Sequence, residues 1–157
     1  MNVIAWIDAL AIASYVVFAS RIAFFDTRHQ LVRNSDVVLG VGFLFVLNLS
    51  RGLVLASWDL LFASTISAVA YGAVYGVLAR WGRGQLGTGD VGLGIYLGLF
   101  LGSWSLDAAV IGWATPFALA ALPSALVWWL KGRKSFLAFG PFIVLSAPLT
   151  LLIVSVY

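Results

Sequence analysis

Residues 3–25 read VIAWIDALAIASYVVFASRIAFF, an apolar run interrupted by one aspartate and one arginine. A helix that crosses a hydrocarbon core of about 30 Å needs roughly 20 residues at about 1.5 Å each. The run is long enough for that. It is too long for the apolar part of a cleaved signal peptide, and no basic segment precedes it. The stretch therefore predicts a transmembrane helix over Val3–Phe25.

Further apolar runs follow along the whole chain, at Val37–Ala56, Leu60–Ala79, Val91–Trp104, Ala108–Leu130 and Phe136–Val156. The chain has 62% hydrophobic and 10% charged residues, whereas soluble domains carry about 25% charged residues. Its mean hydropathy is +1.05. This composition predicts an all-α polytopic membrane protein with six transmembrane helices in a single domain, residues 1–157. The run Val91–Trp104 is short, so either its helix starts below the membrane surface or its boundary lies elsewhere.

The basic residues indicate the orientation of the helices. All of them except Arg51 lie in or beside three alternate loops, as Arg21, Arg28, Arg33, Arg80, Arg83, Lys131, Arg133 and Lys134. Because cytoplasmic loops are enriched in lysine and arginine, both termini are expected outside and the three basic loops in the cytoplasm. The pI of about 9.6 follows from these loops. No nucleic-acid partner is expected, since no basic stripe lies on a polar surface.

Few side chains are available for acid–base or metal chemistry. The chain has no cysteine and no glutamate, one histidine (His29) and six acidic residues, all aspartate. Zinc sites use cysteine, histidine and carboxylate ligands, so neither a metal nor another cofactor is expected. A cysteine nucleophile is excluded.

Four of the aspartates have ordinary structural interpretations. Asp59 and Asp107 lie in the external loops beside tryptophans and are expected to be interfacial anchors or helix caps. Asp8, near the outer end of the first span, is expected to have a buried packing or pairing role. Asp36 follows Ser35 and precedes the Val37 run, which favours a helix N-cap over substrate contact.

The remaining two aspartates, Asp26 and Asp90, lie at cytoplasmic ends of predicted spans. Carboxylates at a membrane boundary are rare and usually functional, although each alone is also compatible with a simple boundary residue. Asp90 follows Gly87, Thr88 and Gly89. These glycines predict a backbone that can adopt a positive φ and approach another chain closely, as a peptidase requires. Two carboxylates at one membrane face indicate acid–base hydrolysis.

Three stretches resemble motifs of the type IV prepilin peptidases. Residues 26–34, DTRHQLVRN, are similar to the family's D-x-R-x-x-x-I-P-N motif, and residues 87–93, GTGDVGL, to its G-x-G-D-x-K-L motif. Residues 137–143, LAFGPFI, resemble the I-P-F-G-P-F/Y-L stretch that follows a basic loop. The motifs come in the family's order and on one predicted side of the membrane.

The resemblance implies an aspartic endopeptidase of the inner membrane that cuts the short basic leader from prepilin-like proteins at the cytoplasmic face. It implies Asp26 and Asp90 as catalytic residues. The residues that it implies for substrate binding or for shaping the site are Arg28, Asn34, Gly87, Thr88, Gly89, Phe139, Gly140 and Pro141. The expected partners are a prepilin-like substrate and the lipid bilayer.

The chain departs from the family's pattern at two positions. Arg33 replaces the proline before Asn34, and Gly92 replaces the lysine after the G-x-G-D aspartate. Larger members of the family carry a cysteine-bearing region and methylate the product. This chain has no cysteine, so it resembles the short, peptidase-only members.

The expected chemistry uses the two carboxylates as a pair. Close like charges do not both ionise readily, so the pair shares a proton; the ionised partner activates water and the neutral one polarises the scissile carbonyl. Asp90 begins a helix, whose dipole favours the anion, and Asp26 ends one. We therefore expect Asp90 to be the ionised partner.

Other features have packing interpretations. Gly94, Gly98 and Gly102 are spaced for close helix packing, as are Gly72 and Gly76. Pro116, Pro123 and Pro148 interrupt spans, and either distort packing or open a lateral path for a substrate helix.

Two functions other than peptidase activity stay open: a non-catalytic homologue that binds pilins or assembly components, and a small proton-coupled transporter subunit.

Overall fold

The computed structural model describes residues 2–29, 33–81, 87–131 and 139–156, with the side chains of residues 26–29 and 131 excepted. The described residues form six α-helices: α1 (Val3–His29), α2 (Asn34–Leu55), α3 (Asp59–Trp81), α4 (Thr88–Gly102), α5 (Leu106–Lys131) and α6 (Gly140–Val156). The prediction of an all-α chain is confirmed.

Four of these helices are long and apolar enough to cross a membrane, at Val3–Phe25, Asn34–Leu55, Asp59–Trp81 and Leu106–Leu130. The helices α4 and α6 have 15 and 17 residues, or about 22 and 26 Å at 1.5 Å per residue. Both are apolar but shorter than a bilayer core. Several apolar helices of this kind are compatible with a multi-pass membrane protein.

The helix boundaries differ from the predicted runs by up to four residues, as at the end of α1, which continues from Phe25 to His29. The helix α4 begins at Thr88 and ends at Gly102, where hydropathy predicts Val91–Trp104. The helix α6 begins at Gly140, and residues 136–138 of the predicted run lie outside the described part.

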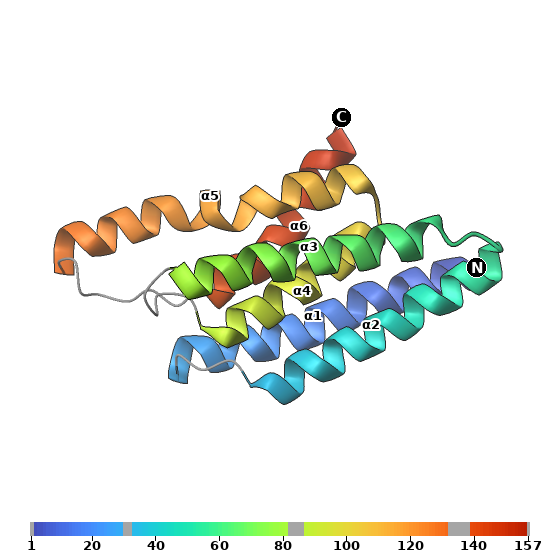
Figure 1. Cartoon of the computed structure of the whole chain (residues 1–157), viewed down its shortest axis with the longest axis horizontal. Coiled ribbons are helices and arrows are strands. Elements are labelled where there is room, and N and C mark those ends of the chain that lie inside the picture. The colour runs from blue at the N-terminus through green and yellow to red at the C-terminus, as the bar shows by residue number, and fades with distance from the viewer. Residues whose placement is uncertain (1, 30–32, 82–86, 132–138, 157) are drawn as a thin grey trace.

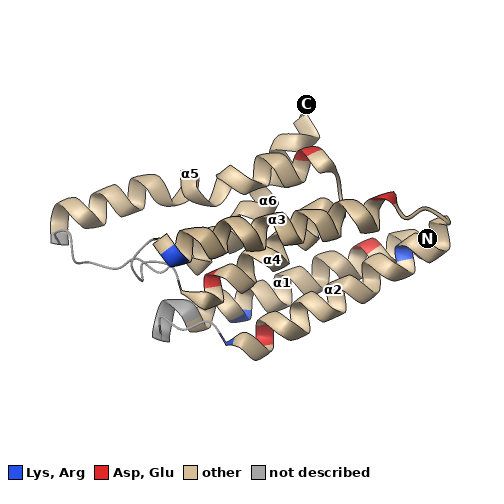
Figure 2. Cartoon of the chain, in the orientation of Figure 1, with Lys and Arg blue, Asp and Glu red and all other residues tan. Residues whose placement is uncertain are grey.

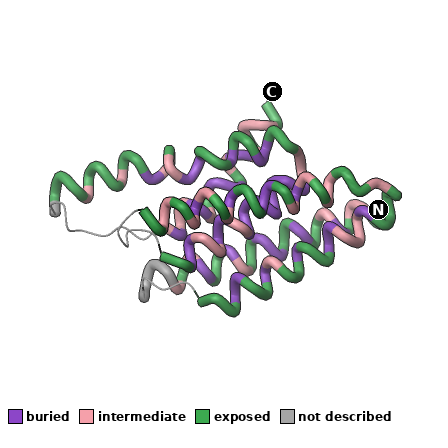
Figure 3. Tube along the Cα trace, in the orientation of Figure 1, coloured by how far each residue is buried: buried purple, intermediate pink, exposed green. Residues whose placement is uncertain are grey.

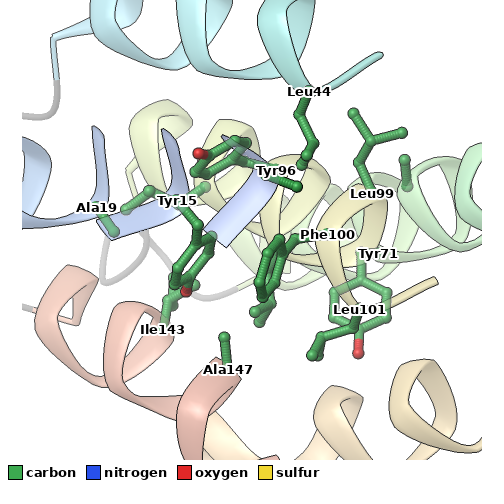
Figure 4. Packing of buried hydrophobic residues seen from close by; sticks show 14 of the residues in the cluster. Tyr15, Ala19, Leu44, Tyr71, Tyr96, Leu99, Phe100, Leu101, Ile143 and Ala147 are labelled. Atoms are coloured by element: carbon green, nitrogen blue, oxygen red, sulfur yellow. The ribbon is translucent and has the colours of Figure 1, made fainter. Parts of the chain in front are cut away.

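The short helix α4 occupies the centre of the bundle (Figures 1 and 3). It packs against α2, α3, α5 and α6, and every residue of its second half, from Tyr96 to Gly102, is buried. In Figure 4, aromatic rings from α1 and α4 fill the core: Tyr15 stacks on Tyr96 at 5.4 Å and on Phe100 at 4.2 Å between ring centroids. The Tyr15 hydroxyl donates to the carbonyl oxygen of Val144 in α6, at 2.9 Å.

Glycines allow α3 and α4 to approach closely. A Cβ placed on Gly98 would lie 2.7 Å from the Ser67 carbonyl oxygen, and one on Gly102 would lie 2.7 Å from the Ser64 Cα. A Cβ placed on Gly94 would lie 2.9 Å from the Tyr75 ring. These distances are too short for any side chain, so the predicted packing role of the α4 glycines is confirmed. Gly72 also makes a close contact, with Ile95, but nothing lies within 4 Å of a Cβ on Gly76.

The end of the bundle where α1 begins contains an ion pair. Asp8 of α1 forms an ion pair with Arg51 of α2, 3.4 Å between Oδ1 and Nη1, and the same Nη1 donates to the Ser103 carbonyl oxygen at 2.9 Å. The expected pairing of Asp8 is thus confirmed. The Ser105 hydroxyl accepts from the Ala108 amide at 3.0 Å, so a serine caps α5 while Asp107 lies in its first turn.

The second half of α5 has little protein around it. Pro116 and Pro123 lie inside this helix, and none of residues 121–130 is buried (Figure 3). Side chains here include the largely exposed Leu122, Trp129 and Leu130. This half of α5 therefore offers its apolar surface to the surroundings.

Candidate active site

The candidate site lies at one end of the bundle. The end of α1, the start of α2, the end of α3 and the start of α4 lie together at the left of Figure 1. Charged residues occur mainly at helix ends and leave the middle of the bundle uncharged (Figure 2). The first two motifs are therefore on elements that end or begin at the same place.

Asp90 lies in the first turn of α4 and is 8% exposed. Its Oδ2 accepts from the Gly87 amide at 2.9 Å, and its own amide donates to the Gly87 carbonyl oxygen at 3.1 Å. A carboxylate that satisfies a free amide at a helix start stabilises the helix, and the helix dipole favours its anion. Asp90 thus has a structural role at the start of α4, and its charge state stays a prediction.

The turn before Asp90 does not use the conformational freedom of glycine at Gly87. This residue has φ −82° and ψ 162°, an extended conformation open to any residue. A Cβ there would meet only Asp90 Oδ2 at 3.8 Å and the Gly89 nitrogen at 3.9 Å. Gly87 therefore does not adopt the positive φ that a glycine allows. Thr88 is exposed and Gly89 is buried.

Asp26 lies in the last turn of α1, which continues to His29. The side chains of Asp26 and Arg28 are outside the described part of the structure. The backbone of Asp26 therefore lies at the end of the bundle where α4 begins. The dyad of Asp26 with Asp90 stays a prediction.

Asp36 forms an ion pair instead of a helix cap. The helix α2 begins at Asn34, its N-cap residue is Arg33, and Asp36 lies in its first turn. Oδ1 of Asp36 accepts from Nη2 of Arg21 in α1 at 3.2 Å, with the Asp36 side chain 6% exposed. The N-cap prediction for Asp36 is wrong, because the helix starts before the apolar run. The pair joins the end of α1 to the start of α2. Asn34 is exposed.

Gly92, where the family has lysine, lies at the contact of α4 with α2. A Cβ on Gly92 would be 2.8 Å from Cγ1 of Val37, which is below any normal carbon–carbon contact. Val37 is the residue after Asp36, so the starts of α2 and α4 touch next to the Arg21–Asp36 pair. In this packing a side chain at position 92 requires Val37 to move.

The third motif reaches the same region through aromatic rings. Phe139 precedes α6, and its carbonyl oxygen accepts from the amides of Phe142 and Ile143 at 3.0 and 3.3 Å. The Phe139 ring is 5.3 Å from Phe117 of α5 and 6.4 Å from Tyr75 of α3, between centroids. Gly140 is buried and Pro141 half-buried at the start of α6. Tyr75 in turn packs on Gly94, one turn after Asp90.

Tyr75 is a residue that the sequence reasoning missed. It is 0% exposed. The signal is visible in the sequence: Ser64, Ser67, Tyr71 and Tyr75 recur at helical spacing in an otherwise apolar helix, and all four are buried. Together they form the face of α3 that meets the glycines of α4.

Two apolar grooves lie elsewhere on the bundle. One of about 480 Å³ lies between α2, α3 and α4, lined by residues that include Phe45, Val69 and Gly72. The other, of about 330 Å³, lies between α3 and α5 near Trp113. Asp90 lines neither groove, so both are separate from the candidate site.

Among the described residues, no three histidine, cysteine or acidic side chains gather in a way that could hold a metal ion. Compared with known proteins, the chain matches no family model, no curated protein and no solved structure.

Proposed function

We propose that this protein is a membrane aspartic endopeptidase that removes the short basic leader of prepilin-like proteins. The observation that carries the proposal is the meeting of three motifs that are distant in sequence. The start of α4, with Asp90, contacts the start of α2 through Gly92 and Val37. It contacts the start of α6 through Tyr75 and Phe139. Arg21, five residues before Asp26 in α1, forms an ion pair with Asp36 at the start of α2.

The proposed reaction needs two carboxylates that share one proton. The Gly87 amide and the start of α4 favour a negative charge on Asp90, which suits the partner that takes a proton from water. Asp26, in the last turn of a helix, is the neutral partner that polarises the scissile carbonyl. The chemistry consists of proton transfers and one attack by water, with no cofactor.

The proposed topology has six spans, both termini outside and the site at the cytoplasmic face of the inner membrane. The asymmetry of the basic loops supports this orientation. For α4 and α6, which are short, a bilayer that thins locally around the bundle provides the crossing at modest cost. The substrate's cleavage site is then presented at the cytoplasmic boundary.

The proposal is tested by co-expression with a candidate prepilin, following the leader on a gel. Asp90→Asn keeps an oxygen that can accept from the Gly87 amide, so the start of α4 is preserved while the charge is lost. Asp26→Asn removes the second carboxylate. Asp59→Asn is the matched control, because Asp59 is an exposed aspartate in the first turn of α3, at the opposite end of that helix. We expect processing by the unchanged protein and by Asp59→Asn only; processing by either of the other variants contradicts the proposal.

A non-catalytic homologue that binds pilins is the second candidate. The contact between Gly92 and Val37 favours it, since the family's lysine has no room there. Such a protein would retain an uncut prepilin on co-purification, and Asp26→Asn and Asp90→Asn would leave this retention unchanged.

The third candidate, a proton-coupled transporter subunit, is tested with the purified protein in proteoliposomes. Proteoliposomes that carry the protein would show proton uptake coupled to a solute, and Asp90→Asn would abolish it.

A further inference from the structure

The hydroxyl of Tyr75 is buried in the bundle, and no described residue forms a hydrogen bond with it. The Tyr75 side chain extends from α3 toward α4, α5 and the start of α6. Its ring centroid lies 5.6 Å from that of Phe117 in α5 and 6.4 Å from that of Phe139, the residue before α6. In an apolar interior an unpaired hydroxyl is costly, so a group that is kept there normally has a use.

The nearest acidic group on the element that Tyr75 packs against is Asp90. The ring of Tyr75 lies on Gly94, and residues four apart in a helix share one face, so Gly94 and Asp90 are neighbours along α4.

Tyr71 is a natural comparison for Tyr75. It lies one turn earlier on α3, is also buried, and its ring stacks on that of Tyr75 at 6.3 Å. Its hydroxyl donates to the Ala109 carbonyl oxygen of α5. Tyr71 therefore links α3 to α5 through its hydroxyl, whereas the hydroxyl of Tyr75, near the candidate site, donates to no described residue.

We propose that Tyr75 is a positioning residue for Asp90: its hydroxyl donates to a bound water that in turn donates to the Asp90 carboxylate. This role rests on the proposed function for its meaning, but the hydrogen bond itself does not. A donor stabilises the ionised carboxylate and fixes its orientation. A buried water held by a tyrosine and an aspartate also fills the polar gap that the unpaired hydroxyl marks.

The other charged groups at this end are the same in every variant considered. The described side chains among them are those of Arg21 in α1, Arg33 before α2, Asp36 in α2 and Arg80 in α3. The described side chains of α6 bring no charge, and those of α5 bring only Asp107, at the opposite end. Tyr15, Tyr71 and Tyr96 are the other buried tyrosines among the described residues. A difference between two tyrosine variants therefore reports on the hydroxyl that was removed.

The test is the titration of Asp90 by infrared spectroscopy of the full chain in lipid nanodiscs. The chain has six acidic residues and no glutamate, so few carboxyl bands occur, and the band lost in Asp90→Asn belongs to Asp90. In Tyr75→Phe we expect the titration midpoint of that band to rise by about one pH unit, because the ionised form has lost a donor. Tyr71→Phe is the control and should leave the midpoint unchanged.

Equal midpoints in Tyr75→Phe and the unchanged protein would overturn the proposal, as would an equal rise in both tyrosine variants. The kinetics of prepilin cleavage, measured as kcat and KM against pH, provide a second test. With a positioning role, Tyr75→Phe lowers kcat and moves the acidic limb of the pH profile upward while KM stays the same. If the midpoint rises but the unchanged protein cuts no prepilin, the proposed function fails and the hydrogen bond stands.

Discussion

At the scale of single residues, the contact between Gly92 and Val37 bears most on activity. A Cβ at position 92 would lie 2.8 Å from Cγ1 of Val37, and the branched side chain of valine has few rotamers with which to give way. The glycine at position 92 therefore fits the packing of α2 on α4. The two positions should be changed together.

We predict that Gly92→Lys lowers the thermal unfolding midpoint by roughly 3–10 °C, because the core between α2 and α4 becomes overpacked. The double change Gly92→Lys with Val37→Ala should recover most of this loss. Differential scanning fluorimetry in detergent measures both. A single Gly92→Lys variant as stable as the unchanged protein would show that α2 and α4 are farther apart than described.

The ion pair between Arg21 and Asp36 gives a second prediction at this scale. The Asp36 side chain is 6% exposed and that of Arg21 is 55% exposed, so removing the arginine leaves a buried carboxylate uncompensated. Arg21→Met should cost about 1–3 kcal/mol. Arg80→Met, which removes an exposed arginine at the same end of the bundle, is the control and should cost less than about 0.5 kcal/mol.

Chemical denaturation in detergent compares the two variants. If both lower the stability equally, the Arg21–Asp36 contact contributes nothing, and net charge accounts for the effect.

The residues show what sequence reasoning could and could not reach. The pairing of Asp8 was predictable, because a carboxylate inside an apolar span needs a partner. The role of Asp36 was not predictable from the sequence. It depends on where α2 begins, at Asn34, and on the position of Arg21 in α1 opposite Asp36, and hydropathy contains neither kind of information. The same holds for Tyr75, whose importance depends on its neighbours in α4 and α6.

At the scale of helices, the packing of α3 on α4 follows from the sequence more directly. Small residues four apart allow helices in a membrane to approach closely. The glycines of α4 meet Ser64, Ser67 and Tyr75 as this rule requires. The helix boundaries could be predicted less accurately from the sequence. The helix α4 starts before its apolar run because Thr88 and Gly89 belong to the first turn, which Asp90 caps.

Gly98 and Gly76 provide a matched pair for testing this packing. A Cβ on Gly98 would lie 2.7 Å from a backbone oxygen of α3, whereas nothing lies within 4 Å of one on Gly76. Gly98→Ala should therefore destabilise by about 1–3 kcal/mol, and Gly76→Ala should be neutral or slightly stabilising. Unfolding in detergent measures both, and a harmless Gly98→Ala would contradict the described packing of α3 on α4.

At the scale of the whole molecule, composition was sufficient for the class but not for the arrangement. An apolar chain with basic loops predicts a helical membrane protein. That the shortest helix, α4, lies at the centre could not be read from hydropathy, since every helix is apolar. It depends on which faces pack, and hence on the glycines and aromatic rings.

The proposed orientation is testable because the chain has no cysteine. Single cysteines introduced as Ser57→Cys and Ser105→Cys should react with a membrane-impermeant maleimide in intact cells. Gly87→Cys, at a position where a side chain is sterically accepted, should react only after the membrane is opened. Labelling of position 87 in intact cells would reverse the topology and place the site outside.

The central claim is that Asp26 and Asp90 together hydrolyse a peptide bond, and the most direct measurement uses purified protein in nanodiscs. The substrate is a synthetic peptide with a basic leader, a glycine and an apolar helix, and the products are identified by mass spectrometry. We expect one cut after the glycine by the unchanged protein and by Asp59→Asn, and none by Asp26→Asn or Asp90→Asn. An intact peptide with the unchanged protein, or a cut peptide with either of the last two variants, would contradict it.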